Sequence, residues 1–217
     1  MKSGIRIIAH RGVHVFEREN TLPAFRLSLR FDGAELDVRA TKDGKIVVSH
    51  DATLSRVFKS PARIKSRTYS ELKKEVVELP LLGEALKIIK GRIAMVEIKE
   101  AGIEEEVVGI VKKSGAVKNV IITSFLENVL KKVKTLDRRI KTGLIVVVPF
   151  NAVKAAVKLN CDAICFFHKI LPDFMIAKAV EAGLEVYIWT VDDEEEFKKF
   201  SKQKITGIVS NNPGGLK

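Results

Sequence analysis

The sequence has no long hydrophobic run. Its longest uninterrupted apolar stretch, Leu144 to Pro149, has the length of a strand, whereas a membrane-spanning helix needs about 18 or more apolar residues. The apolar segment near the start, Ile5 to Ala9, is too short for the core of a signal peptide, and no cleavage site of small residues follows it. We therefore expect a cytoplasmic protein without stable membrane insertion.

Cysteine is also scarce. Cys161 and Cys165 are the two cysteines among 217 residues, and they flank the start of a predicted strand. Four residues along a strand span about 13 Å, which exceeds the separation of about 7 Å between Cα atoms that a disulfide tolerates. We interpret both cysteines as small core side chains rather than as disulfide partners or metal ligands.

Acidic residues are fewer than basic ones. The chain has 27 aspartates and glutamates and 38 lysines and arginines, which gives a net charge of +11. A basic chain can bind nucleic acid. Here, however, the lysines occur on predicted helices, interleaved with glutamates, and no aromatic stacking platform accompanies them. We interpret them as solvated outer faces and expect no nucleic-acid partner. A basic surface would still attract anionic substrates or membrane surfaces, and the oligomeric state stays open.

Short β-branched runs alternate with helical patterns along the whole chain. The predicted strands cover residues 5–10, 34–39, 93–99, 120–125, 142–148, 163–167, 185–191 and 207–210. The predicted helices cover residues 21–30, 70–77, 82–90, 103–113, 127–136, 153–159, 173–182 and 194–202. Eight apolar strands of the βα kind indicate an α/β fold, a parallel (β/α)8 TIM barrel, with residues 1–217 in a single domain. An open doubly wound sheet is the alternative, although it usually has fewer strands.

A further strand at residues 46–50 breaks this alternation. Only about six residues separate it from the second barrel strand, and a parallel crossover needs a dozen or more. We therefore expect a short antiparallel hairpin, with Asp43-Gly44 as its turn. With these two residues at the tip, Asp37 lies opposite His50, and a bulge would shift this register by one residue. The hairpin returns a histidine to the carboxylates of the second strand.

Chemically reactive side chains lie at the predicted carboxyl ends of the strands, where barrel enzymes have their active sites. These residues are His10, Arg11, Glu35, Asp37, His50, Asp51, Glu97, Lys99, Ser124, Phe125, His168 and Trp189. Side chains two apart on a strand share a face, so Glu35 points the same way as Asp37. If that face is the barrel mouth, three carboxylates converge there together with Glu97. They would repel one another unless a cation neutralised them, and oxygen-only ligands favour Mg²⁺ or Ca²⁺ over zinc.

Each of these residues also has a purely structural interpretation. A Glu-x-Asp pair on a strand usually faces solvent, and a strand-end histidine such as His10 often has only a structural hydrogen bond. Glu97 and Lys99 are compatible with an ordinary surface ion pair. The functional interpretation rests on the placement of the whole set at strand ends on the same side of the predicted barrel.

Several motifs together resemble the glycerophosphodiester phosphodiesterase family, and the resemblance extends over essentially the whole chain. The motifs in the first part of the chain are Ala9-His10-Arg11-Gly12, Glu19-Asn20-Thr21, Gly33-Ala34-Glu35-Leu36-Asp37-Val38, Thr41-Lys42-Asp43-Gly44 and Val47-Val48-Ser49-His50-Asp51. The later ones are Pro80-Leu81 with Glu84, Val96-Glu97-Ile98-Lys99, Ser124-Phe125, Trp189-Thr190-Val191 and Gly207-Ile208. The first fifty residues carry the most specific part of the match.

The resemblance implies a TIM-barrel hydrolase that cleaves glycerophosphodiesters to glycerol 3-phosphate and an alcohol with a divalent metal, Mg²⁺ or Ca²⁺, with Mn²⁺ as a further option. Carried over by position, the metal ligands are Glu35, Asp37 and Glu97, and the general base and acid are His10 and His50. The substrate-binding residues are Arg11, Lys99, Trp189 and Phe125, and the supporting residues are Glu19 and Asn20.

These roles agree with elementary chemistry. A phosphodiester is negatively charged and repels nucleophiles, so a metal ion and two cationic side chains would neutralise it. Two histidines titrate near neutrality, so that one can accept a proton while the other donates one. The sequence leaves open which histidine is the base, and whether the attacking group is the glycerol 2-hydroxyl, through a cyclic phosphate, or water.

Two departures from the family pattern concern the site. Asn211 stands where an aspartate is frequent, and the stretch from Ala52 to Lys90 lacks the large inserted domain of many members. Two rival functions remain. One is a lysophospholipase D-like enzyme with the same site, which an apolar groove beside Trp189 and Phe125 would favour. The other is a catalytically silent barrel that only binds anionic ligands.

Overall fold

The computed structural model describes residues 4–216, and its centre is a closed ring of eight parallel strands. The strands are β1 (Arg6–Ala9), β2 (Gly33–Ala40), β4 (Ile93–Ile98), β5 (Val120–Ser124), β6 (Lys141–Val146), β7 (Ala163–Phe167), β8 (Glu185–Trp189) and β9 (Gly207–Ser210). The ring closes because β1 pairs with β9 on one side and with β2 on the other. The predicted TIM barrel is thus confirmed, and the open sheet is wrong.

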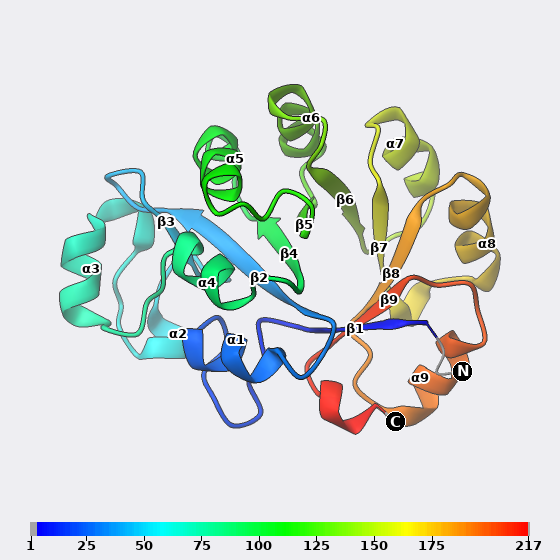
Figure 1. Ribbon diagram of the computed structural model, residues 1–217, viewed down its shortest axis with the longest axis horizontal. Helices are drawn as coiled ribbons and strands as arrows, with labels where there is room; N and C mark the ends of the chain where they lie inside the picture. Colours follow the sequence, from blue (N-terminus) through cyan, green and yellow to red (C-terminus); the bar gives the residue numbers. More distant parts are fainter. Residues whose placement is uncertain (1–3, 217) are drawn as a thin grey trace.

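Helices cover the outside of the ring, with α5 to α8 following one another around it and α1 and α9 on the opposite side (Figure 1). They are α1 (Leu22–Ser28), α2 (Ser55–Phe58), α3 (Tyr69–Glu75), α4 (Leu82–Ile88), α5 (Glu104–Lys113), α6 (Glu127–Leu136), α7 (Ala152–Lys158), α8 (Asp173–Glu181) and α9 (Glu194–Ser201), with 3₁₀ turns η1 (Ile64–Ser66), η2 (His168–Ile170) and η3 (Pro213–Gly215). The sequence did not predict α2 and the 3₁₀ turns, because three or four residues carry no helical period. Within residues 4–216 no helix has the length and apolar character that crossing a bilayer requires.

Two apolar layers hold the barrel together. Side chains such as Met95, Ile121 and Tyr187 fill its interior, and Cys165 lies among them as a free thiol. A second layer lies between the strands and the surrounding helices. The predicted core placement of both cysteines is confirmed, since Cys161 is also buried and free. A filled interior makes the barrel a rigid frame, so that the site at its mouth is built on fixed strand ends.

The predicted hairpin is present, but its register is one residue away from the expected one. Strand β3 (Ile46–Val48) pairs antiparallel to β2 outside the barrel, with Val38 opposite Val48. The loop has three residues rather than two, because Gly44 adopts a left-handed conformation with φ of +73°, as in a type I turn with a bulge. Asp37 therefore faces Ser49, whose backbone N–H donates to the Asp37 carbonyl at 2.9 Å. The sequence analysis left open that a bulge would shift the register by one residue, and the loop has this bulge.

The chain between β3 and β4 forms a small lobe beside the hairpin rather than a large inserted domain. Helices α2 and α3 and the turn η1 belong to it, whereas the buried side of α4 packs on the barrel strands. Leu54, Ile64, Leu72 and Leu79 form a separate apolar cluster with Val47 of β3. The lobe thus covers the outer edge of the hairpin and fixes the residues that follow it.

Close contact between strands gives a prediction for Gly33, the first residue of β2. A Cβ atom at this position would lie 2.1 Å from the carbonyl oxygen of Ile93 on β4, so the two strands would have to move apart. Gly33→Ala should lower the free energy of unfolding by about 1–3 kcal/mol, the usual cost of overpacking, as measured by urea denaturation. The matched control is Gly109→Ala in α5, where the added Cβ meets nothing within 4 Å and should stabilise the helix by roughly 0.5–1 kcal/mol. Equal stabilities of the two variants would contradict this view of the strand packing.

Candidate active site

Three buried carboxylates meet at the mouth of the barrel. Glu35 and Asp37 project from β2, and Glu97 lies opposite Asp37 on the neighbouring strand β4. One oxygen of each lies within 4.8 Å of the others, and the residues are 6%, 0% and 8% exposed in that order. The convergence that the spacing predicted is confirmed. Oε1 of Glu35 has no hydrogen-bond partner in the described residues, although buried polar atoms normally have one.

Two cationic side chains reach this cluster. The Lys99 ammonium lies 2.6 Å from Oε1 of Glu97 and 3.0 Å from Oδ1 of Asp37. Nε of Arg11 lies 3.4 Å from Oδ2 of Asp37. Both cations thus contact Asp37. Glu35 is therefore the carboxylate whose negative charge is compensated least by neighbouring cations.

The pKa values of the carboxyl groups follow this arrangement. Burial, together with the neighbouring negative charges, raises the pKa of Glu35 well above its ordinary value, and the same causes raise the pKa of Glu97 to about 7. Burial also acts on Asp37, but Lys99 and Arg11 outweigh it and hold the pKa of that carboxyl below its usual range. A cation bound at the free oxygen of Glu35 would remove the repulsion. Hard divalent ions prefer such oxygen ligands, so the donor set fits one.

The loop after β1 holds Arg11 in place. Arg11 and Asn20 both adopt left-handed backbone conformations, with φ of 55° and 57°, and Asn20 N–H donates to the Arg11 carbonyl at 2.9 Å. Gly12 is required between them, because a Cβ there would lie 2.8 Å from the backbone of Ala24. The His-Arg-Gly and Glu-Asn-Thr motifs are therefore the two ends of one closed loop.

Glu19 and Asn20 at the end of this loop, which the resemblance marks as supporting residues, contact Arg11 and Asp37. Glu19 accepts a hydrogen bond from the Arg11 guanidinium at 3.0 Å and two from Arg56, at 2.8 and 2.7 Å. The Asn20 amide donates to Oδ2 of Asp37 at 2.8 Å. These contacts restrict both Arg11 and the buried carboxylate to one orientation.

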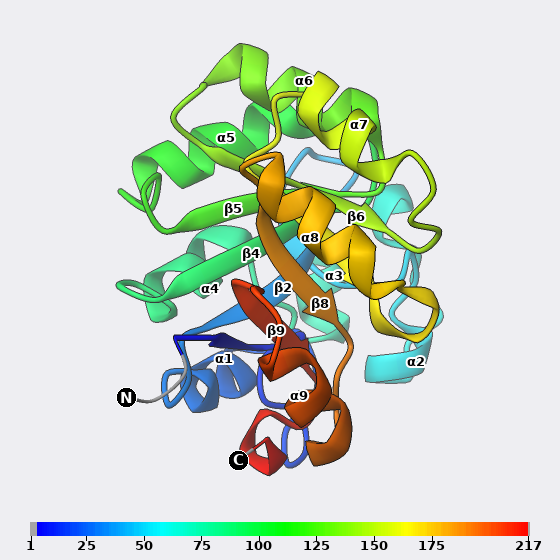
Figure 2. The same ribbon diagram turned by 90° about the vertical axis from the view of Figure 1, so that its right-hand side faces the viewer.

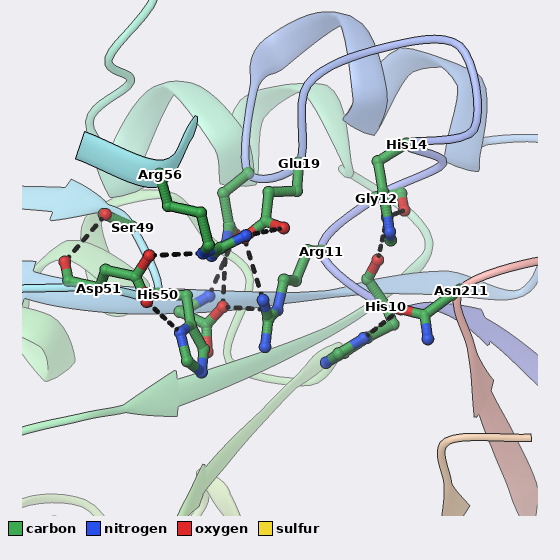
Figure 3. Close-up of polar contacts among 12 residues, drawn as sticks. His10, Arg11, Gly12, His14, Glu19, Ser49, His50, Asp51, Arg56 and Asn211 are labelled. Carbon is green, nitrogen blue, oxygen red and sulfur yellow. Dashed lines mark hydrogen bonds and ion pairs between the residues drawn. The ribbon is translucent and has the colours of Figure 1, made fainter. Parts of the chain in front are cut away.

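His10 is oriented by a chain of two further residues, and Figure 3 shows the first contact of this chain, between His10 and Asn211. The amide of Asn211 donates to Oδ2 of Asp192 at 2.7 Å, and its backbone N–H donates to Oδ1 at 2.6 Å. These contacts turn the Asn211 carbonyl oxygen toward Nδ1 of His10, 2.7 Å away. Nδ1 must then carry the proton, and Nε2 keeps its lone pair, 3.8 Å from Oε2 of Glu35. Burial and the charge of Arg11 lower the pKa of His10 to about 4.

His50 has a different partner. Its Nδ1 lies 2.7 Å from Oδ1 of Asp51, and the other oxygen of Asp51 accepts from Nε of Arg56, also at 2.7 Å. Arg56 thus joins Asp51 to Glu19, as the dashed lines of Figure 3 show. The partner of Nδ1 is thus a negatively charged carboxylate at His50 and an uncharged amide at His10.

The two histidines open into one cavity of about 180 Å³. Its polar wall consists of His10, Arg11, Glu35, His50, Glu97 and Lys99, and its apolar wall includes Met95, Phe125, Ile145, Cys165, Trp189 and Val209. The rings of Phe125 and Trp189 meet edge to face with centroids 5.9 Å apart, and Trp189 donates from its indole N–H to the Cys165 carbonyl at 3.0 Å. All predicted substrate-binding residues line this cavity. Asp37 lies below it, behind Lys99.

A larger hollow of about 890 Å³ lies beside α6 and α7. Solvated side chains such as Lys131 and Lys158 line it, and it contains no group of converging carboxylates or histidines. We therefore place the candidate site in the smaller cavity, because the carboxylates and histidines converge there.

Asp192 is the residue that the sequence analysis missed. It follows β8 closely and bonds to the residue after β9, so its place at a strand end was the available signal. The sequence did mark Asn211 and Asp51, but not their hydrogen bonds. Those depend on loop conformations that no local pattern specifies.

Comparisons with known proteins match almost the whole chain to one family. The model of the "Glycerophosphoryl diester phosphodiesterase family" matches residues 10–215. The glycerophosphodiester phosphodiesterase of Caldanaerobacter subterraneus subsp. tengcongensis is 31% identical over 97% of this chain and 95% of its own length. The putative glycerophosphodiester phosphodiesterase YhdW of Bacillus subtilis is 30% identical over 95% of this chain and 94% of its own.

Solved structures give the same result. A glycerophosphodiester phosphodiesterase from Thermotoga maritima has a TM-score of 0.86 at 29% identity and covers 96% of this chain and 95% of its own. A phosphodiesterase from Oleispira antarctica, solved in complex with the product sn-glycerol-3-phosphate, has a TM-score of 0.85 at 26% identity, with 96% and 93% covered.

The repulsion at Glu35 gives a prediction about stability. Because the pKa of this carboxyl is raised in the folded state, its contribution to stability is lost as pH rises, and ionised Glu35 destabilises the fold at neutral pH. Glu35→Gln should therefore raise the free energy of unfolding in a chelator by about 1–3 kcal/mol, measured by urea denaturation.

Added Mg²⁺, Ca²⁺ or Mn²⁺ should then stabilise the unsubstituted chain more than the Glu35→Gln variant, because an ion that binds only the folded state adds to its stability. Glu106→Gln on the exposed surface of α5 is the control and should respond to the ions like the unsubstituted chain. An equal gain for the Glu35 variant and the unsubstituted chain would place the ion elsewhere.

Proposed function

The chain belongs to the glycerophosphoryl diester phosphodiesterase family, and we propose that it hydrolyses glycerophosphodiesters to glycerol phosphate and an alcohol with the aid of a divalent cation. It is a phosphodiesterase enzyme, and its substrate is a small molecule. The observation that carries the mechanism is the presence of two differently supported histidines and a buried acidic cluster in one cavity. The bound product of the Oleispira antarctica relative supports glycerol phosphate as the retained half.

The cation would be held by Glu35, Asp37 and Glu97. When bound there, a divalent ion supplies positive charge to a phosphate oxygen without a proton. The unpartnered oxygen of Glu35 supports this placement, as does the raised pKa of Glu97, because both indicate negative charge that the side chains of the site do not fully compensate. Mg²⁺ and Ca²⁺ suit an all-oxygen set, and Mn²⁺ accepts the same ligands.

Arg11 and Lys99 bind the phosphate group. Both are partly buried cations on the polar wall of the cavity, where the reduced dielectric constant strengthens their attraction for an anion. Arg11 is fixed by Glu19, so little entropy is lost when the substrate binds. On the facing wall, Phe125 and Trp189 limit the space for the carbon part of the substrate.

His10 is the general base. A base must be unprotonated before it acts, and burial beside Arg11 keeps its pKa low, at about 4. Its Nε2 carries the free lone pair because Nδ1–H donates a hydrogen bond to the Asn211 carbonyl oxygen. It takes a proton from the attacking oxygen, which belongs to the glycerol 2-hydroxyl or to water. Asp192 holds Asn211 in the orientation that this tautomer requires.

His50 is the general acid. An acid must carry a proton at the start, and the Asp51 carboxylate, 2.7 Å from Nδ1, orients the ring for this role. It gives a proton to the oxygen of the leaving alcohol as the bond between that oxygen and phosphorus breaks. The unequal partners of the two imidazoles thus assign them opposite roles, as a base and acid pair requires.

The roles of the histidines predict a dependence on the leaving group. His10→Ala and His50→Ala should each lower kcat by roughly 10²–10⁴ on glycerophosphocholine. On a diester whose leaving group is p-nitrophenol, which departs without protonation, His50→Ala should recover most of its activity, whereas His10→Ala should not. Both rates are measured with the same ion and buffer, and thermal unfolding verifies that the variants are folded. Recovery by the His10 variant instead would reverse the assignment, and near-normal turnover of both would refute it.

The support of His10 predicts an effect on turnover rather than on binding. Asn211→Leu has a similar shape but leaves Nδ1 of His10 without an acceptor, so the correct tautomer is no longer fixed. We expect kcat to fall by up to ~10²–10⁴, the full contribution of a general base, with a small change in KM. Asn211→Asp retains an acceptor and should keep more activity than the leucine variant. A rise in KM at constant kcat would mean that Asn211 contacts the substrate instead.

A further inference from the structure

The exposed large apolar side chains of this protein gather at one end of the barrel. In the described residues eleven such side chains are exposed, and nine of them follow the carboxyl end of a strand. These nine are Val15, Phe16, Phe125, Leu126, Val147, Val148, Phe150, Ile170 and Phe174. The other two, Val77 and Val157, lie after α3 and on α7. Single exposed apolar residues are normal, but a concentration of them on one face indicates an interaction site.

The nine residues lie on both sides of the mouth. Seven of them follow β5, β6 and β7, which are neighbours in the ring, and the other two follow β1. In the order of the ring, β1 stands four places from β6, directly across the barrel. The loops after β6 and β7 extend to the same side of the molecule in Figure 2. A flat surface laid across the mouth would therefore touch apolar side chains on opposite sides of the cavity.

Among these nine residues the exposure is largest for three aromatic rings. Phe16 is 86% exposed, Phe150 82% and Phe174 66%. Burial of such rings would be favourable, and the barrel core does not need these side chains, since its interior is filled by others. We call the nine residues together the apolar rim.

An apolar hollow joins the rim to the catalytic cavity. It has a volume of about 330 Å³ and lies between the loops after β5 and β6, with Val147, Val148 and Phe150 in its lining. Phe125 and Ile145 line both this hollow and the cavity of the two histidines. A molecule that enters along the rim therefore meets apolar surface up to the catalytic groups.

We propose that the apolar rim docks on the surface of a lipid bilayer that contains anionic lipids, and that the enzyme finds its substrate there. The flat arrangement around the mouth suits a bilayer, in which aromatic and aliphatic side chains reach the boundary between headgroups and acyl chains. The net charge of +11 supplies attraction for an anionic surface.

Two further features of the rim concern charge. Lys154 and Lys169 are exposed close to Phe150 and Ile170, where they can contact lipid phosphates. Carboxylates at Glu17, Glu127 and Asp173 lie among the same loops. The long-range attraction therefore comes from the charge of the whole chain, and the contact itself depends on the apolar side chains. The choice of substrate rests on the proposed function, whereas the docking does not.

The test is a vesicle sedimentation experiment on the full chain in a chelator, with vesicles of phosphatidylcholine with or without phosphatidylglycerol. The unsubstituted chain should bind the vesicles with phosphatidylglycerol more tightly than pure phosphatidylcholine. Phe16→Ser together with Phe150→Ser removes one ring from each side of the mouth and should weaken binding by about 10-fold or more. The control is Val77→Ser with Val157→Ser, exposed apolar residues outside the rim, which should bind like the unsubstituted chain.

Turnover separates this proposal from the proposed function. The Phe16 and Phe150 double variant should hydrolyse soluble glycerophosphocholine at the unsubstituted rate, because neither residue lines the catalytic cavity. Failure of the unsubstituted chain to bind anionic vesicles, or equal binding by the rim variant, would overturn the docking. So would a dimer in gel filtration that the rim variant dissociates without any vesicle binding, since a second copy of the chain would then cover the rim. Absence of hydrolysis by the unsubstituted chain would refute only the proposed function.

Discussion

The structure of the site depends on the burial of three carboxylates at neighbouring strand ends. Burial disfavours ionised groups, and Glu35, Asp37 and Glu97 also repel one another. Lys99 compensates Asp37 and Glu97, and Arg11 compensates Asp37, so Glu35 is the carboxylate whose negative charge is compensated least. A protein keeps such an arrangement where a positively charged ligand completes it. The cluster therefore orders the other parts of the site, because the cations that balance it are the ones that we propose as the phosphate-binding groups.

The second constraint is the difference between the two imidazoles. They line one cavity, yet His10 contacts an amide and His50 contacts a carboxylate at the same ring position. The amide is itself fixed by a carboxylate, Asp192, which lies one hydrogen bond further away. This arrangement keeps the tautomer of His10 and places the negative charge one hydrogen bond further from the ring. An asparagine at position 211 is thus compatible with catalysis, where the family frequently has an aspartate.

Much of the fold and of the site could be predicted from the sequence. Barrel strands are recognisable as short apolar runs, and their carboxyl ends lie at the same end of the barrel. That rule sufficed to predict from the sequence alone that Glu35 and Glu97 lie close together. It failed where backbone conformation in loops decides the outcome. The left-handed Gly44 added a residue to the hairpin turn and put Ser49 opposite Asp37. The bond between Asp192 and Asn211 joins two loops 19 positions apart, and no periodicity encodes such a contact.

A bound ion at the acidic cluster is the claim on which the mechanism rests, and anomalous X-ray scattering from crystals soaked in Mn²⁺ tests it most directly. We expect one strong peak within coordination distance of carboxylate oxygens from Glu35, Asp37 and Glu97, and its loss in crystals soaked with a chelator. A peak at another position, or an empty cluster in crystals of protein that hydrolyses glycerophosphodiesters in the same Mn²⁺ solution, would contradict the proposed role of these three acids.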